Sequence, residues 1–150
     1  MTTTLTAADF LTAEERSRVA QAIGEAERAT SGEIRVHLED HIEEDVMDHA
    51  AFIFEEIGMH RTRARNGVLI YVSVADRKVA VIGDKGINEV VPTGFWNDVV
   101  AVLKLHFVAG RRADGFCEAV RMVAAKLHER FPQRADDTNE LTNEVSIARR

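Results

Sequence analysis

The sequence predicts a single α/β domain built on a mixed β-sheet. Two segments rich in β-branched residues, 33–39 and 68–74, are separated by a segment of helical periodicity, which is the pattern of two parallel strands joined by a helix. A third apolar segment, residues 78–82, follows the second so closely that a hairpin is possible but a crossover is not. The sheet therefore combines parallel and antiparallel pairs.

Composition and charge narrow the class of protein. With 150 residues, 45% of them apolar and 29% charged, the chain has the balance of one soluble globular domain with a sizeable core. Nineteen basic against twenty-five acidic residues give a net charge of -6, whereas nucleic acids and anionic membranes require a concentrated positive field. We therefore expect no nucleic-acid partner, and cations stay open as partners.

The sequence shows no segment typical of export or membrane insertion. The amino terminus lacks a basic stretch followed by an apolar run, and no window approaches the roughly 20 apolar residues of a spanning helix. Cys117 is the only cysteine, which excludes an internal disulfide and a cysteine-based zinc cluster. We expect a cytoplasmic protein without an integral membrane segment.

The first helix is predicted to begin after Thr12. Glu15 stands three residues later, so the two side chains can form the reciprocal pair of a capping box. Val19 and Ile23 continue an apolar face at helical spacing, and the helix should run to about Thr30, before the Ser-Gly break.

The next segment, residues 33–39, is predicted to be a strand with one polar face. Its side chains alternate strictly, with Ile34, Val36 and Leu38 on one side and Arg35, His37 and Glu39 on the other. Such alternation indicates that one side of this strand faces an apolar core.

A second helix and a hairpin follow. Apolar residues at helical spacing run from Val46 to Ile57, and Gly58 is the expected stop. Residues 68–74 are apolar at almost every position, which is typical of a central strand covered on both faces. Residues 78–82 should pair with this strand in the antiparallel direction.

Two long helices and a polar tail complete the chain. Thr93 is the expected cap of a helix that carries apolar residues up to the stop at Gly110. The next helix ends with Phe131, before Pro132. Residues 132–150 are mostly polar, which predicts a tail that is partly disordered or laid along the domain surface.

Several quoted segments together resemble a known family. The segments "TSGEIRVHLE", "RNGVLIYVSVADRKVAVIGDKGINEVVP" and "HFVAGRRADGFCEAV" stand in the order seen in TPM-domain proteins, and the chain is similar to small soluble bacterial members. The resemblance covers residues 11–131 and leaves residues 1–10 as an N-terminal extension and residues 132–150 as a polar C-terminal tail. It implies a three-layer α/β/α sandwich with helices on both faces of a small mixed sheet.

The resemblance implies fold more closely than function. Members are linked with binding of calcium or other divalent ions, with acid-phosphatase activity in thylakoid-lumen relatives, and with accessory roles in larger complexes. Longer relatives often carry a signal peptide and a membrane or glycine-rich tail, and neither is evident in this sequence. A membrane-linked role is therefore not expected.

Acidic residues gather where the two parallel strands are expected to end. The "ADRK" turn supplies Asp76, the first choice of ligand, and the loop after the first strand supplies Glu39, Asp40 and Asp45. Carboxylate oxygens in loops suit Ca²⁺ or Mg²⁺, so these residues are alternative candidates for a metal site. The alternative is an ordinary solvated hairpin turn, because Asp is favoured in turns by local hydrogen bonding.

A second acidic loop, "GDKGINE", offers Asp84 as a further metal ligand. The alternative is that its glycines supply positive φ angles for a strand-to-helix turn. Since the hairpin reverses the chain, Asp84 is expected at the opposite end of the sheet from Asp76. Arg77 and Lys85, the basic neighbours of these two carboxylates, are the candidates for phosphate binding.

Histidine and cysteine give weaker signals. His37, His41 and His49 lie in and after the first strand, but their spacing matches no strong zinc signature. Cys117 lies on an apolar helical segment without the arginine loop of a cysteine phosphatase, which favours a buried structural thiol.

Three functions remain open from the sequence. The first is an accessory module that binds calcium or a similar divalent cation weakly and interacts with a partner protein. The second is a metal-dependent phosphatase of low activity, for which no nucleophile motif is present. The third is a metal-free scaffold for protein interaction that uses apolar and aromatic residues.

Overall fold

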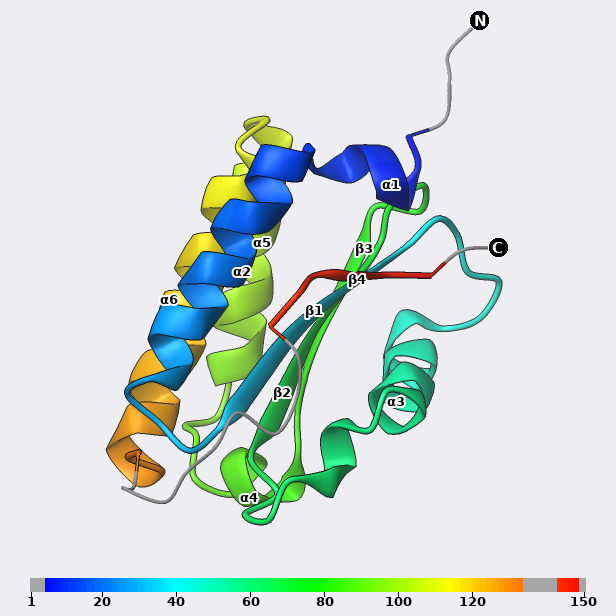
Figure 1. The fold of residues 1–150 in the computed structure, drawn as a ribbon. Coiled ribbons are helices and arrows are strands. Elements are labelled where there is room, and N and C mark those ends of the chain that lie inside the picture. The colour runs from blue at the N-terminus through cyan, green and yellow to red at the C-terminus, as the bar shows by residue number, and fades with distance from the viewer. Residues whose placement is uncertain (1–4, 134–142, 149–150) are drawn as a thin grey trace, which may run out of the picture.

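The computed structural model describes residues 5–133 and 143–148. Its helices are α1 (Ala7–Phe10), α2 (Ala13–Glu27), α3 (Val46–Glu56), α4 (Lys85–Asn88), α5 (Phe95–Val108) and α6 (Arg112–Arg130), with a short 3-10 helix, η1 (Met59–Arg61), after α3. Its strands are β1 (Glu33–Glu39), β2 (Gly67–Ser73), β3 (Lys78–Gly83) and β4 (Ser146–Ile147). These elements form an α/β sandwich, as the sequence predicted (Figure 1).

The sheet is mixed and has the order β3-β2-β1-β4. Strand β1 runs parallel to β2, with Glu33 opposite Gly67 and Glu39 opposite Ser73. Strand β3 runs antiparallel to β2, with Lys78 opposite Ser73. The parallel pair and the hairpin that the sequence predicted are therefore both confirmed.

The two faces of the sheet differ in their cover. Helices α2, α5 and α6 lie against one face and α3 lies against the other, so the molecule has three layers (Figure 1). Alternation in the strands explains this division, because Val36 and Ile70 point to the three-helix side while Leu69 and Tyr71 point to the α3 side. All four side chains are buried.

Local signals at the helix ends explain where the helices begin. Thr12 and Glu15 form the predicted capping box of α2, with the Thr12 hydroxyl accepting from the Glu15 amide at 3.1 Å. The expected cap of α5 is wrong, since Gly94, and not Thr93, is its N-cap. Gly94 has a φ of 85°, which lets the chain turn into α5 without a side-chain cap.

The glycines of the "GDKG" segment have a different purpose from the one predicted. Neither is among the residues with positive φ. Instead, a Cβ at Gly83 would lie 2.4 Å from the Trp96 ring, and a Cβ at Gly86 would lie 2.2 Å from the Ala64 carbonyl oxygen. These glycines permit close packing of neighbouring segments.

Both ends of the described chain contribute to the fold. Residues 7–10, which the sequence assigns to an N-terminal extension, form α1, whose Phe10 is 6% exposed and packs into the three-helix core. Within the predicted tail, Ser146 and Ile147 form β4 and pair in parallel with His37 and Leu38. The sparse apolar residues of this segment gave no strand signal, because two residues are too short for a periodicity. The middle of the predicted tail, residues 134–142, lies outside the described residues.

Candidate functional site

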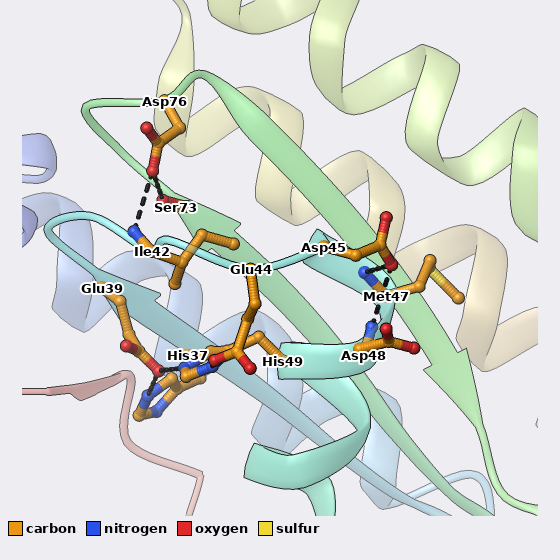
Figure 2. Close-up of polar contacts among 10 residues, drawn as sticks. All are labelled: His37, Glu39, Ile42, Glu44, Asp45, Met47, Asp48, His49, Ser73 and Asp76. Carbon is orange, nitrogen blue, oxygen red and sulfur yellow. Dashed lines mark hydrogen bonds and ion pairs between the residues drawn. The ribbon is translucent and has the colours of Figure 1, made fainter.

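The carboxyl ends of β1 and β2 bring the predicted acidic loop and the predicted turn together. The chain after β1 stays beside the turn after β2, because the Val74 amide donates to the Glu39 carbonyl and the Ala75 amide donates to the Asp40 carbonyl, both at 2.9 Å. Figure 2 shows that Asp76 approaches this loop from the β2–β3 turn, near Ile42. Three of the predicted metal ligands, Glu39, Asp40 and Asp76, therefore lie at one end of the sheet, whereas Asp45 lies further along the loop, where α3 begins.

Asp76 fastens the turn to the loop. Its Oδ2 atom accepts hydrogen bonds from the Ser73 hydroxyl at 2.6 Å and from the Ile42 amide at 2.9 Å (Figure 2). The His41 Nδ1 atom lies 2.9 Å from both oxygens of the carboxylate. The hydrogen bond from Ser73, followed by those from Ile42 and His41, lowers the pKa of Asp76 to about 2.

His41 lies between two carboxylates at the surface. Its other ring nitrogen, Nε2, is 2.7 Å from a carboxylate oxygen of Glu43. The hydrogen bonds to Glu43 and then Asp76 raise the pKa of His41. Its side chain is half exposed, whereas that of Asp76 is only 20% exposed. The imidazole thus covers the outer side of the Asp76 carboxylate.

The carboxylate of Glu39, the last residue of β1, is fully buried. The Oε1 atom of Glu39 lies 3.0 Å from Nε2 of His49 and 3.3 Å from Nε2 of His37 (Figure 2). Burial lowers the pKa of His37, and the nearby Glu39 offsets this effect only in part. Nδ1 of His49 contacts the carboxylate of Glu44, and the Tyr71 ring lies beside both imidazoles.

The other two carboxylates of this group serve local structure. Asp40 accepts a hydrogen bond from the Ala7 amide at 2.7 Å and so ties α1 to the loop. Asp45 is the N-cap of α3 and accepts from the amides of Met47 and Asp48 at 3.0 and 3.1 Å. Both side chains thus satisfy backbone donors that the fold leaves open.

Asp84 lies at the opposite end of the hairpin, as predicted. It binds Arg65 through two hydrogen bonds of 2.7 and 2.9 Å and caps the short helix α4. Arg77 and Lys85, the predicted phosphate ligands, flank opposite ends of β3 and so do not share a site. Arg77 has a φ of 54°, an unusual conformation for a residue with a side chain.

A further carboxyl pair, at the amino end of β1, was not predicted. Glu27 at the end of α2 lies beside Glu33, which is 2% exposed. Glu27 accepts from the Ile34 amide at 2.8 Å, yet burial raises its pKa to about 9 and the Glu33 charge adds to this effect. The signal was easily missed, because each residue alone is typical of a helix end or a strand start.

The donor set determines which metal could be held. Within residues 5–133 and 143–148, no group of three or more His, Cys, Asp or Glu side chains is arranged to hold a metal ion. The oxygen donors suit a hard cation, but the carboxylates of Asp40, Asp45 and Asp76 already accept hydrogen bonds from the protein. Among the described residues, these side chains therefore form no closed cage of six to eight protein oxygens.

Sequence reasoning missed the partners of the candidate ligands. Ser73 and the Ile42 amide hold Asp76, and His49 with His37 holds Glu39. The three histidines do not converge, since His41 is bound to Asp76 and not to Glu39. The signal for Ser73 was present, because a polar residue at the end of an otherwise apolar strand indicates a specific partner.

Cys117 is a buried thiol, as predicted. It is 3% exposed on α6, and burial raises the pKa of its thiol, which disfavours the reactive thiolate.

Across the helices that the structure describes, none is both long enough and apolar enough to cross a membrane.

Comparison with known proteins identifies the family. The model of the TPM domain matches residues 5–126. The NMR structure of the BA42 protein from the psychrophilic bacterium Bizionia argentinensis superimposes with a TM-score of 0.86 at 43% sequence identity, over 93% of this chain and 96% of that one. The N-terminal domain of a protein from P. gingivalis shares the fold, with a TM-score of 0.68 and 20% identity over 85% of this chain and 84% of that one. No curated protein gives a significant sequence match. With the family model covering most of its length, this chain belongs to the TPM-domain family.

Proposed function

We propose that this chain is a cytoplasmic TPM-domain accessory module that binds Ca²⁺, or Mg²⁺ in its place, weakly at the carboxyl ends of β1 and β2 and acts through a partner protein. The observation that carries the proposal is the state of Asp76. Three neighbours keep its pKa at about 2, so it is a carboxylate at every physiological pH. Its side chain is still 20% exposed and stands beside the acidic loop.

The surroundings of Asp76 favour a positive charge. The place between Asp76 and Glu43 is already filled by the His41 ring, whose two nitrogens face the two carboxylates. A hydrated cation would use the same negative field after the half-exposed His41 side chain moves away. Because the ion has to compete with existing hydrogen bonds, the expected affinity is low.

An isotope-labelled sample titrated with calcium tests the site. We expect saturable amide shifts in residues 40–43 and 73–77, and a smaller response to magnesium, which gives up its hydration water reluctantly. Asp76→Asn should remove the shifts, whereas Glu129→Gln, at an exposed residue on α6, should leave them unchanged. Shifts spread over all acidic segments and suppressed by moderate salt would show counterion association in place of a site.

Exposed apolar side chains on α3 support the proposal that a partner protein binds. Met47 and Phe52 on α3 are 50% and 58% exposed, and the Phe52 ring lies 5.9 Å from that of the buried His49. A photo-crosslinking residue at position 52 should give one discrete adduct in cells, and the same residue at position 121, exposed on α6, should give none. Equal labelling from both positions would contradict the partner proposal.

The phosphatase alternative has less support. Its two candidate phosphate ligands, Arg77 and Lys85, lie at opposite ends of β3, and the Cys117 thiol is buried. Hydrolysis of a generic phosphate ester that depends on added metal and is lost in Asp76→Asn would revive this alternative. Activity that survives this substitution would have another source.

A further inference from the structure

A pocket of about 710 Å³ lies on the three-helix side of the hairpin. It is bounded by α1, by the last turns of α5, by the start of α6 and by the ends of β2 and β3. This volume is within the range of pockets that hold small ligands, roughly 300–1,000 Å³. The Asp76 carboxylate does not line the pocket, but its neighbours Ala75 and Arg77 do, so the pocket adjoins the candidate cation site at the β2–β3 turn.

The inner surface of the pocket is apolar. Val72, Val74 and Val79 line it from the strands, and all three are buried in the main core. Phe10 and Phe107 line it from the helices and pack against each other edge to face, with ring centroids 5.2 Å apart. An alkyl chain or an aromatic ring would therefore lose its contact with water here.

Three positively charged side chains also line the pocket, and no acidic side chain does. Arg112 is oriented by its hydrogen bond of 3.2 Å to the Phe10 carbonyl and lies over the Phe10 ring at 4.7 Å. Arg77 and Lys104 are exposed and form no ion pair with any residue that the structure describes. On a chain of net charge -6, three basic side chains and no acidic one line this pocket.

We infer that this pocket binds a small amphipathic anion, namely a monocarboxylate with a medium-length apolar chain. The apolar chain would lie against the valines and phenylalanines, and the carboxylate would lie among Arg77, Lys104 and Arg112. At the φ of 54° of Arg77, a glycine would be less strained.

Four probes of matched size or charge test the inference on the full chain by NMR titration: octanoate, octan-1-ol, octyltrimethylammonium and acetate. Octanoate should give saturable shifts at residues 72–79 and 104–112 and bind at least about tenfold more tightly than the other three. Equal binding of octan-1-ol or octyltrimethylammonium would overturn the role of the cations. Equal binding of acetate would overturn the role of the apolar surface.

The matched variants remove charge without disturbing the core. Arg77→Gly suits the left-handed position, and Lys104→Gln is at an exposed helical residue. The double variant should weaken octanoate binding about tenfold and leave octan-1-ol binding unchanged. Lys126→Gln removes the same kind of charge outside the pocket and should bind octanoate like the parent. Unchanged octanoate affinity in the double variant, or absence of saturable binding to the parent, would refute the proposal.

Discussion

At the carboxyl end of β1, the carboxylate of Asp76 accepts hydrogen bonds from Ser73, Ile42 and His41, and its pKa is about 2. At the amino end of the same strand, the carboxyl group of Glu27 accepts one amide hydrogen bond, from Ile34, and faces the second carboxyl group of Glu33. There the pKa is raised to about 9. The surroundings at the carboxyl end of β1 thus keep Asp76 charged, and those at the amino end keep Glu27 neutral.

The difference teaches that the supply of donors, together with burial, decides the charge state. Burial alone acts against the charged form at both ends, since it raises the pKa of any carboxyl group. At Asp76, the donors more than offset this effect. At Glu27 a single donor does not, and the neighbouring acid adds repulsion. The amino end of β1 is therefore a poor place for a cation-binding carboxylate, even though two acids lie there.

The largest expected loss of stability comes from placing a new carboxyl group in the core, where it finds no hydrogen-bond donor. Ile70 is fully buried in the middle of β2, among apolar residues of the three-helix core. Ile70→Asp should lower the free energy of unfolding by several kcal/mol, because it removes a core side chain and buries an unsatisfied polar group. Denaturant unfolding measures this loss. A variant as stable as the parent would contradict both the central position of β2 and the importance of donors.

A neutral side chain at the amino end of β1 should stabilise the protein. Because the pKa of Glu27 is raised in the fold, its stabilising neutral form is complete below pH 4.5 and is lost as pH rises toward 9. Glu27→Gln cannot ionise and should be more stable than the parent at pH 8 by about 1–3 kcal/mol, with little difference at pH 4. Urea unfolding at both pH values measures the gain. Glu25→Gln, at an exposed residue of α2, is the control, and an equal gain there would refute the explanation.

The carboxyl end should show the opposite pH dependence and a smaller effect. Because the pKa of Asp76 is lowered in the fold, its contribution is complete above about pH 4 and is lost as pH falls through 2. With a chelator present, the parent should lose more stability between pH 4 and pH 2 than Asp76→Asn does. Thermal unfolding over this range provides the measurement. Parallel pH profiles for the two proteins would show that Asp76 is not held as an ion by its neighbours.

The smallest change in stability is expected from substituting two arginines that have a left-handed backbone, one at each end of the β2–β3 hairpin. Arg65 has a φ of 53° and pairs with Asp84, whereas Arg77 has a φ of 54° and no such partner among the described residues. Arg77→Gly should leave the free energy of unfolding within about 1 kcal/mol of the parent, since relief of strain offsets the added chain entropy. Arg65→Gly should be the less stable variant, because it also breaks an ion pair. Thermal unfolding of both variants tests this order, which the reverse result would overturn.

Much of the fold was predictable from the spacing of apolar residues and from the residues that begin and end helices and strands. The alternation of residues 33–39, the apolar run of residues 68–74 and the capping box at Thr12 each correspond to an element of the structure. These signals are local, so one sequence is enough to read them. Strand β4 and the packing of α1 depend on contacts between residues far apart in the chain, which no local pattern reveals.

The candidate site was predictable in its location but not in its bonding. Parallel strands place their carboxyl ends together, which brought Asp76 to the loop of Asp40 as expected. The sequence did not show that Ser73 and the Ile42 amide would occupy one oxygen of Asp76, or that Glu39 would be buried between imidazoles. Such pairings depend on side-chain directions and ångström-scale distances, and the sequence contains neither directly.

Strand β4 has a consequence for self-association. A sheet whose outermost strand exposes unpaired amides and carbonyls is a template for the strand of another molecule. Here Ser146 and Ile147 cover β1 at His37 and Leu38, and the Ala148 amide donates to the Leu38 carbonyl at 3.0 Å. The segment that contains β4 thus occupies part of the free edge of β1, where the strand of a second molecule would otherwise pair.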